Sequence, residues 1–107
     1  MSFIAAFEII NDTAEITLAG ELDASTAPIF KAEIEKAIGI DIKKLILIMN
    51  DLEYMSSAGL RVLIFAKQKM GAKVDIYLVG MQEIVRDTIE KTGFHHSVIV
   101  SDEYPIN

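Results

Sequence analysis

The hydrophobic and polar positions at the start of the chain follow the period of a β-hairpin. Residues 3–10 are apolar and β-prone, Asn11-Asp12 is a turn pair, and residues 15–18 alternate polar with apolar side chains. Gly20 is expected to end the second strand. The pattern therefore predicts two antiparallel strands joined by a tight turn.

A helical period replaces this alternation after residues 20–23. Asp23, Ser25 or Thr26 is available as the helix cap, and Pro28 is tolerated only in the first turn. Gly39 is expected to close this helix. Its core stripe falls at helical spacing: Ala27, Phe30, Ile34, Ala37 and Ile38.

The rest of the chain alternates strands with helices. Residues 44–49 form an apolar run without alternation, which is typical of a central strand buried on both faces. We expect a loop at 50–55, a helix from Ser57 to Met70 stopped by Gly71, a strand at 73–79, a helix at 81–91, a short strand at 97–100 and a frayed tail at 102–107. The stripe of the last helix would comprise Met81, Ile84, Val85, Thr88 and Ile89.

This order of elements defines the expected fold. A hairpin followed by alternating helices and strands predicts an α/β chain with a mixed, mostly parallel sheet of about five strands and covering helices. Residues 1–107 have room for one domain. We therefore expect a single domain without a linker.

Two adjacent serines mark the turn between the predicted central strand and the following helix. At a helix N-terminus the unpaired N–H groups and the positive end of the dipole would tolerate a phosphate on Ser57. The alternative is that serine is only a common N-cap here. Ser57 is thus a candidate for a reversible switch, and Ser56 for the same modification.

The helix after this turn has two different faces. Gly59, Val62, Leu63, Ala66 and Met70 share the predicted core face. Arg61 and Gln68 lie opposite, flanked by Ile64 and Phe65, and exposed apolar surface of this kind predicts a protein partner. The alternative is that the tail around Tyr104 and Ile106 covers Ile64 and Phe65.

Composition narrows the classes of partner. The net charge of −6 argues against a nucleic acid or an anionic membrane and favours a basic partner surface. The chain has no cysteine, no apolar segment of membrane-spanning length and no basic region before its first apolar run. We therefore expect a cytoplasmic protein without a signal peptide.

Enzymatic patterns are weak. Residues 55–59 resemble a nucleophile elbow but lack its first glycine, and the two histidines, His95 and His96, are neighbours in a distant loop. They also lack the spacing of metal ligands, and no nucleotide-binding glycine motif occurs. We expect no catalysis, metal or cofactor, and keep a small serine hydrolase as an alternative.

Two segments carry a resemblance to a known family. Residues 18–23 (Leu-Ala-Gly-Glu-Leu-Asp) and 51–60 (Asp-Leu-Glu-Tyr-Met-Ser-Ser-Ala-Gly-Leu), followed by the βαβ order, resemble the STAS domains of bacterial anti-sigma factor antagonists. In that family the serine two positions before the glycine is phosphorylated, which here is Ser57.

The resemblance implies a partner switch. The unphosphorylated chain would bind an anti-sigma factor with GHKL-type serine kinase activity, phosphorylation would end the binding, and a PP2C-type phosphatase would reverse it. We expect the partner to contact the two motifs and the outward helix face, at Glu21, Asp23, Ser56, Ser57, Gly59, Leu60, Arg61, Ile64 and Phe65.

The chain departs from the family at two positions. Ser56 replaces the usual acidic residue before the phosphorylated serine, and Ile48 replaces an Asp or Asn near the end of the preceding strand, whereas Asp23 matches. These departures leave open slower phosphorylation, phosphorylation of Ser56, or a STAS scaffold or accessory subunit that never switches.

Overall fold

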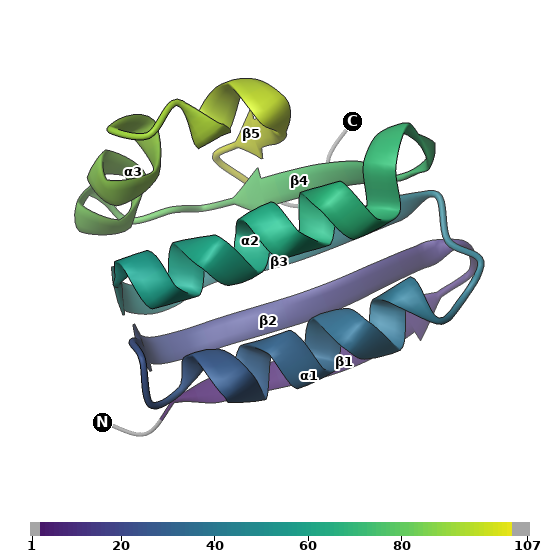
Figure 1. Cartoon of the computed structure of the whole chain (residues 1–107), viewed down its shortest axis with the longest axis horizontal. Helices are drawn as coiled ribbons and strands as arrows, with labels where there is room; N and C mark the ends of the chain where they lie inside the picture. The colour runs from purple at the N-terminus through teal and green to yellow at the C-terminus, as the bar shows by residue number, and fades with distance from the viewer. Residues whose placement is uncertain (1–2, 104–107) are drawn as a thin grey trace.

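A computed structural model, which describes residues 3–103, shows a five-stranded mixed sheet with the strands in chain order (Figure 1). β1 (Ile4–Ile10) pairs antiparallel with β2 (Thr13–Leu22). β2, β3 (Lys44–Met55), β4 (Asp75–Val79) and β5 (Ile99–Ser101) are parallel. The predicted α/β architecture with its N-terminal hairpin is confirmed.

Both strands that lead to the two family-like segments are longer than predicted. Gly20 does not end β2: it adopts a positive φ of 89° beside an irregularity in the strand register, and β2 continues to Leu22. The predicted loop at 50–55 is likewise wrong, because these residues extend β3. The two extensions pair with one another, Gly20 with Leu52 and Leu22 with Met55.

The helices connect successive parallel strands. Residues 3–103 contain α1 (Ala27–Ile38), α2 (Ser57–Met70) and α3 (Glu83–Glu90), with short 3₁₀ turns at Gly71–Lys73 and Phe94–Ser97. The predicted bounds of α2 are confirmed, since Gly71 leaves the helix with a φ of +59°. Among these described helices, none combines the length and the apolar character needed to cross a membrane.

The stripe predicted for α3 needs one correction. Met81, Val85 and Ile89 are buried, but Ile84 is 54% exposed. The helix begins only at Glu83, so Val85 and Ile89 set its buried face and Ile84 turns outward in the first turn. The α1 stripe is confirmed except at Ile38, which is half-buried.

The core lies between the sheet and the helices. α1 and α2 lie side by side across one face of the sheet (Figure 1), and buried side chains of β2, β3 and β4 join those of all three helices in one apolar cluster. Residues 45–47 of β3 are all buried, as the unbroken apolar run predicts for a central strand.

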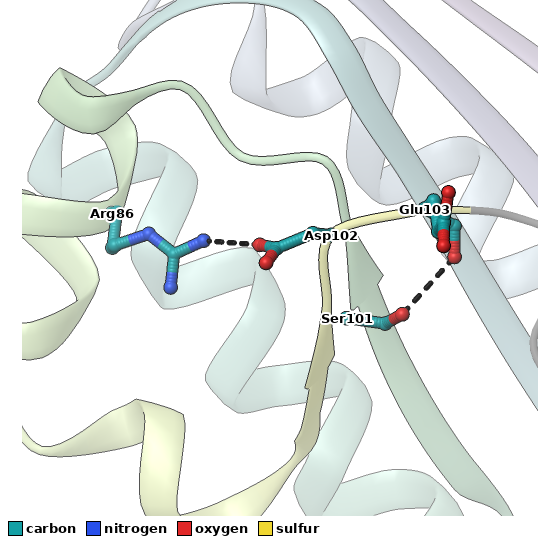
Figure 2. A network of polar contacts seen from close by, with 4 residues as sticks. All are labelled: Arg86, Ser101, Asp102 and Glu103. Atoms are coloured by element: carbon teal, nitrogen blue, oxygen red, sulfur yellow. Dashed lines mark hydrogen bonds and ion pairs between the residues drawn. The ribbon is translucent and has the colours of Figure 1, made fainter.

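The chain beyond β5 is tied to α3. The Arg86 guanidinium pairs with the Asp102 carboxylate at 3.0 Å, and the Ser101 hydroxyl donates to the Glu103 carbonyl oxygen at 3.0 Å (Figure 2). Of the tail predicted at 102–107, positions 104–107 lie outside the described residues. The alternative that Tyr104 and Ile106 cover Ile64 and Phe65 therefore also lies outside them.

Candidate functional site

The carboxyl ends of β2 and β3 meet the start of α2 at the two-serine turn. The Ser56 N–H donates to the Leu22 carbonyl oxygen at 2.8 Å, directly after the Leu22–Met55 pair. The end of β2 therefore fixes the backbone of the turn. The segments 18–23 and 51–60, which are far apart in the sequence, form one continuous edge of the fold.

The two serines differ in accessibility. Ser56 is the N-cap of α2, and its carbonyl oxygen accepts the Leu60 N–H at 3.1 Å. Less than 1 Å² of its Oγ is accessible, and this atom has no hydrogen-bond partner within residues 3–103. Ser57, the first residue of α2, is exposed. An exposed serine therefore lies at the positive end of the helix dipole.

Asp23 organises the loop between β2 and α1. Its carboxylate accepts hydrogen bonds from the Ser25 hydroxyl at 2.7 Å, the Ser25 N–H at 2.9 Å and the Thr26 N–H at 3.2 Å. The Ser25 hydroxyl, followed by the backbone donors, holds the pKa of the Asp23 carboxyl below its ordinary value. Of the three predicted cap residues, Thr26 is the N-cap by position but makes no side-chain cap bond.

Thr26 closes the same loop from the other side. Its Oγ1 accepts the Asp23 N–H at 2.9 Å and donates to the Glu21 carbonyl oxygen at 3.0 Å. The Glu21 side chain itself is exposed. Of the acidic residues predicted to contact a partner, Glu21 is thus free to do so, whereas Asp23 is already bound within its own loop.

The outward face of α2 is a regular stripe. Ser57, Arg61, Ile64 and Gln68 are all exposed, as expected for positions spaced at i, i+4, i+7 and i+11, and Ile64 is 37% exposed. Arg61 and Ile64 are therefore placed beside Ser57, as the sequence predicts.

Three other predicted contact residues lie elsewhere. Gly59 and Leu60 are buried under the turn, so they shape it from inside instead of presenting a surface. Phe65 is half-buried against the core. The Lys31 Nζ of α1 lies 4.8 Å from its ring centroid, so Phe65 is at the α1–α2 junction and not on the stripe.

Three exposed apolar residues at this edge were missed by sequence reasoning. Ile29 is 50% exposed in the first turn of α1, Tyr54 is 41% exposed near the end of β3, and Ile84 is 54% exposed in the first turn of α3. Because the helices follow parallel strands, their first turns gather at the same edge of the sheet as Ser57 (Figure 1). The helical period leaves Ile29 outside the predicted core stripe of α1, but no local signal separates Tyr54 and Ile84 from core positions.

The charges at this edge are mostly negative. Glu21, Asp51, Glu53 and Glu83 are exposed here, with Arg61 as a positive neighbour. Within residues 3–103 no cluster of three or more His, Asp or Glu side chains could hold a metal ion. The edge thus combines exposed apolar anchors, an acidic rim and an exposed serine, which suits protein docking.

The geometry gives no base to Ser57. In the described part of the chain no hydrogen bond joins Ser57 to either histidine, and the rings of His95 and His96 pack on one another with centroids 3.9 Å apart. Within residues 3–103, neither histidine is therefore placed as a base for Ser57.

Comparison with known proteins finds similar domains in both sequence and structure. The model of the STAS domain family matches residues 5–105. BtrV of Bordetella bronchiseptica, whose name describes an anti-sigma factor antagonist, is 32% identical over 78 residues, which cover 72% of this chain and 67% of BtrV.

Solved structures share the fold. An anti-sigma factor antagonist from Mycobacterium paratuberculosis superposes with a TM-score of 0.89 at 21% identity, covering 96% of this chain and 88% of that one. Unphosphorylated SpoIIAA gives a TM-score of 0.81 at 22% identity, covering 94% and 90% of the two chains. The phosphorylated form of SpoIIAA, from Bacillus, gives 0.72 at 21% identity, covering 95% and 93%.

Proposed function

The chain belongs to the STAS domain family, and we propose that it is an anti-sigma factor antagonist whose binding is switched off by phosphorylation of Ser57. The observation that carries the proposal is the exposed Ser57 at the start of α2, beside a buried Ser56 hydroxyl. The names of BtrV and of the structural relatives support the antagonist role.

The site explains how one phosphate would act on binding and not on folding. A phosphoserine carries about −1.5 to −2 charges, and the first turn of a helix accommodates such an anion through its free N–H groups. The surrounding edge carries exposed Ile29, Tyr54, Ile64 and Ile84, which a partner would have to desolvate. Placing a dianion within that contact is costly unless the partner supplies a matching cation.

The partners follow from the same proposal. The unphosphorylated chain would bind an anti-sigma factor with GHKL-type serine kinase activity, and a PP2C-type phosphatase would restore the binding form. The acidic rim of Glu21, Asp51 and Glu53 favours a basic docking surface on the kinase. Kinase, ATP and antagonist would meet in the cytoplasm, and this chain needs no catalytic group of its own.

A non-switching STAS scaffold or accessory subunit is the second candidate. Ser56 provides no carboxylate next to Ser57, and Ile48 places an apolar side chain in β3 where the family has a polar one. If phosphorylation depends on such groups to orient the hydroxyl, this chain would bind its partner without being released.

Phosphopeptide mapping after incubation with the cognate kinase and ATP tests the proposal. We expect modification of Ser57 in the wild type and in Ser56→Ala, and none in Ser57→Ala. Modification at Ser56 alone would contradict the assignment. Tight kinase binding without any phosphate transfer would instead support the scaffold. Turnover of a general ester substrate that disappears in Ser57→Ala would support a hydrolase.

A further inference from the structure

A groove runs between the C-terminal halves of α1 and α2, at the end of the molecule away from Ser57. One hollow of about 330 Å³ is lined by Glu35, Ile38, Gly39, Phe65 and Lys69. A second hollow of about 160 Å³ continues it toward the loop after α1 and shares Ile38 and Lys69 with the first. The two hollows therefore form one surface feature with a largely apolar floor.

Two unpaired cations stand over the aromatic part of this floor. The Lys31 Nζ lies 4.8 Å and the Lys69 Nζ 5.9 Å from the centroid of the Phe65 ring. Within residues 3–103 neither ammonium group forms an ion pair, whereas Lys36 pairs with Glu33 at 3.0 Å. A ligand that carries a carboxylate next to a large apolar side chain could pair with these ammonium groups and pack on the apolar surface beside them.

We propose that this groove docks an acidic segment of a partner protein, with a large apolar side chain seated against Phe65 and carboxylates paired with Lys31 and Lys69. Lys73 lines the adjoining hollow, so the groove has three lysines against two carboxylates, those of Glu35 and Asp41, which also line the hollows. The charge of the groove therefore complements an acidic segment.

The two ends of the molecule would bind partner segments of opposite charge. The Ser57 edge carries exposed Glu21, Asp51 and Glu53, which would repel the same acidic segment. Phe65 and Lys69 follow Ser57 by eight and twelve residues, about 12 and 18 Å along the α2 axis, and both separations exceed the Debye length of about 8 Å at physiological salt. A charge on Ser57 is therefore largely screened from the groove, and this inference does not rest on the proposed switch.

Selection from a phage-displayed library of random dodecapeptides tests the groove directly. We expect the recovered peptides to carry a large apolar side chain flanked by Asp or Glu. Their fluorescein-labelled forms should bind the wild type and bind Lys69→Glu about tenfold more weakly by anisotropy. Lys91→Glu makes the same charge change at an exposed site beyond α3 and should retain the affinity. Ser57→Asp should retain it too.

Four results would overturn the proposal. The first is recovery of peptides without an acidic bias, or of no binding peptide. The second is equal weakening by Lys69→Glu and Lys91→Glu, which would indicate a general charge effect. The third is loss of peptide binding in Ser57→Asp, which would place the peptide at the other edge. The fourth is concentration-dependent self-association that Lys69→Glu abolishes, because the occupant would then be a second copy of this chain.

Discussion

Gly59 lies so close to Leu22 that a Cβ atom at position 59 would be 2.6 Å from the Leu22 Cγ. The same atom would be 3.2 Å from the Met55 Cγ. Leu22 ends β2 and Met55 ends β3, and both side chains are at most 1% exposed. The missing side chain of Gly59 thus lets the first turn of α2 rest directly on the two strand ends that hold Ser57.

Gly59→Ala should therefore destabilise the fold even though alanine favours a helix. The propensity gain is about 1 kcal/mol, but pushing buried Leu22 and Met55 aside costs about 1–3 kcal/mol, so we expect a net loss of up to about 2 kcal/mol. Urea unfolding measures it. In the control Gly39→Ala the nearest atoms would be 3.7 and 3.8 Å away and φ is −77°, so no loss is expected. Equal effects in the two variants would refute the close contact.

Ser57→Asp should separate binding from folding. A negative charge at the first residue of α2 stabilises the helix by about 0.3–1 kcal/mol, so the melting temperature should stay constant or rise slightly. Affinity for the anti-sigma factor should fall. Gln68→Asp adds the same charge to the same exposed stripe near the other helix end and should retain the affinity. A loss of binding caused by unfolding would count against the switch.

Ser56→Ala should cost less than an ordinary N-cap substitution. Removing a serine cap typically costs about 1 kcal/mol, but the Ser56 side chain makes no cap hydrogen bond, so we expect less than about 0.5 kcal/mol. Thr26→Ala provides the contrast, because its hydroxyl bonds the Glu21 carbonyl oxygen and the Asp23 N–H, and about 1 kcal/mol or more should be lost. Equal costs on urea unfolding would show that Ser56 does cap the helix.

The bounds of an element could be predicted from the sequence where its last residues require an unusual backbone conformation. The bounds of α2 follow from its helical period and from Gly71, because the positive φ at position 71 suits glycine better than other residues. Gly20 carries the same signal but marks an irregularity inside β2, because pairing with β3 continues beyond it. At Gly20 and Gly71 glycine permits a positive φ, and pairing with a neighbouring strand determines whether the element ends there.

The site was only partly predictable for a similar reason. Ser57, Arg61 and Ile64 follow from the period of one helix, so their common face could be worked out locally. That Ile29, Tyr54 and Ile84 come together depends on how three separate elements begin or end at one edge of the sheet. Phe65 was misplaced because Lys31 of α1, which packs over its ring, lies 34 residues earlier in the sequence.

Acid should weaken the loop that Asp23 holds. Hydrogen bonds from Ser25 and Thr26 lower the pKa of Asp23 from 3.8, so its folded-state pKa lies below the unfolded one. The stabilisation is then complete above the unfolded value and is lost as the pH falls through the folded one. Unfolding free energies measured from pH 6 to pH 2 should therefore show the advantage of the wild type over Asp23→Asn shrinking only at the acidic end.

Ser25→Ala tests the cause of that shift. It removes the hydroxyl that donates to the Asp23 carboxylate at 2.7 Å and keeps the carboxylate itself. The dependence on pH in the acidic range should become shallower than in the wild type. An unchanged profile would show that the Ser25 hydroxyl does not set the pKa of Asp23.

The neighbours Ile64 and Phe65 should respond oppositely to truncation. Ile64 is exposed on the stripe that begins at Ser57, so Ile64→Ala should leave the melting temperature nearly unchanged and weaken partner binding, by about 2 kcal/mol if it is a central anchor. Phe65 packs against the core beneath Lys31, so Phe65→Ala should destabilise the fold. The loss should be smaller than that for truncating a fully buried aromatic residue, which is about 3–5 kcal/mol. Thermal unfolding and affinity for the anti-sigma factor must be measured on the same two proteins. If Phe65→Ala kept a wild-type melt and lost binding while Ile64→Ala did the reverse, the partner would dock over the α1–α2 junction and not along the face of α2 that carries Ser57.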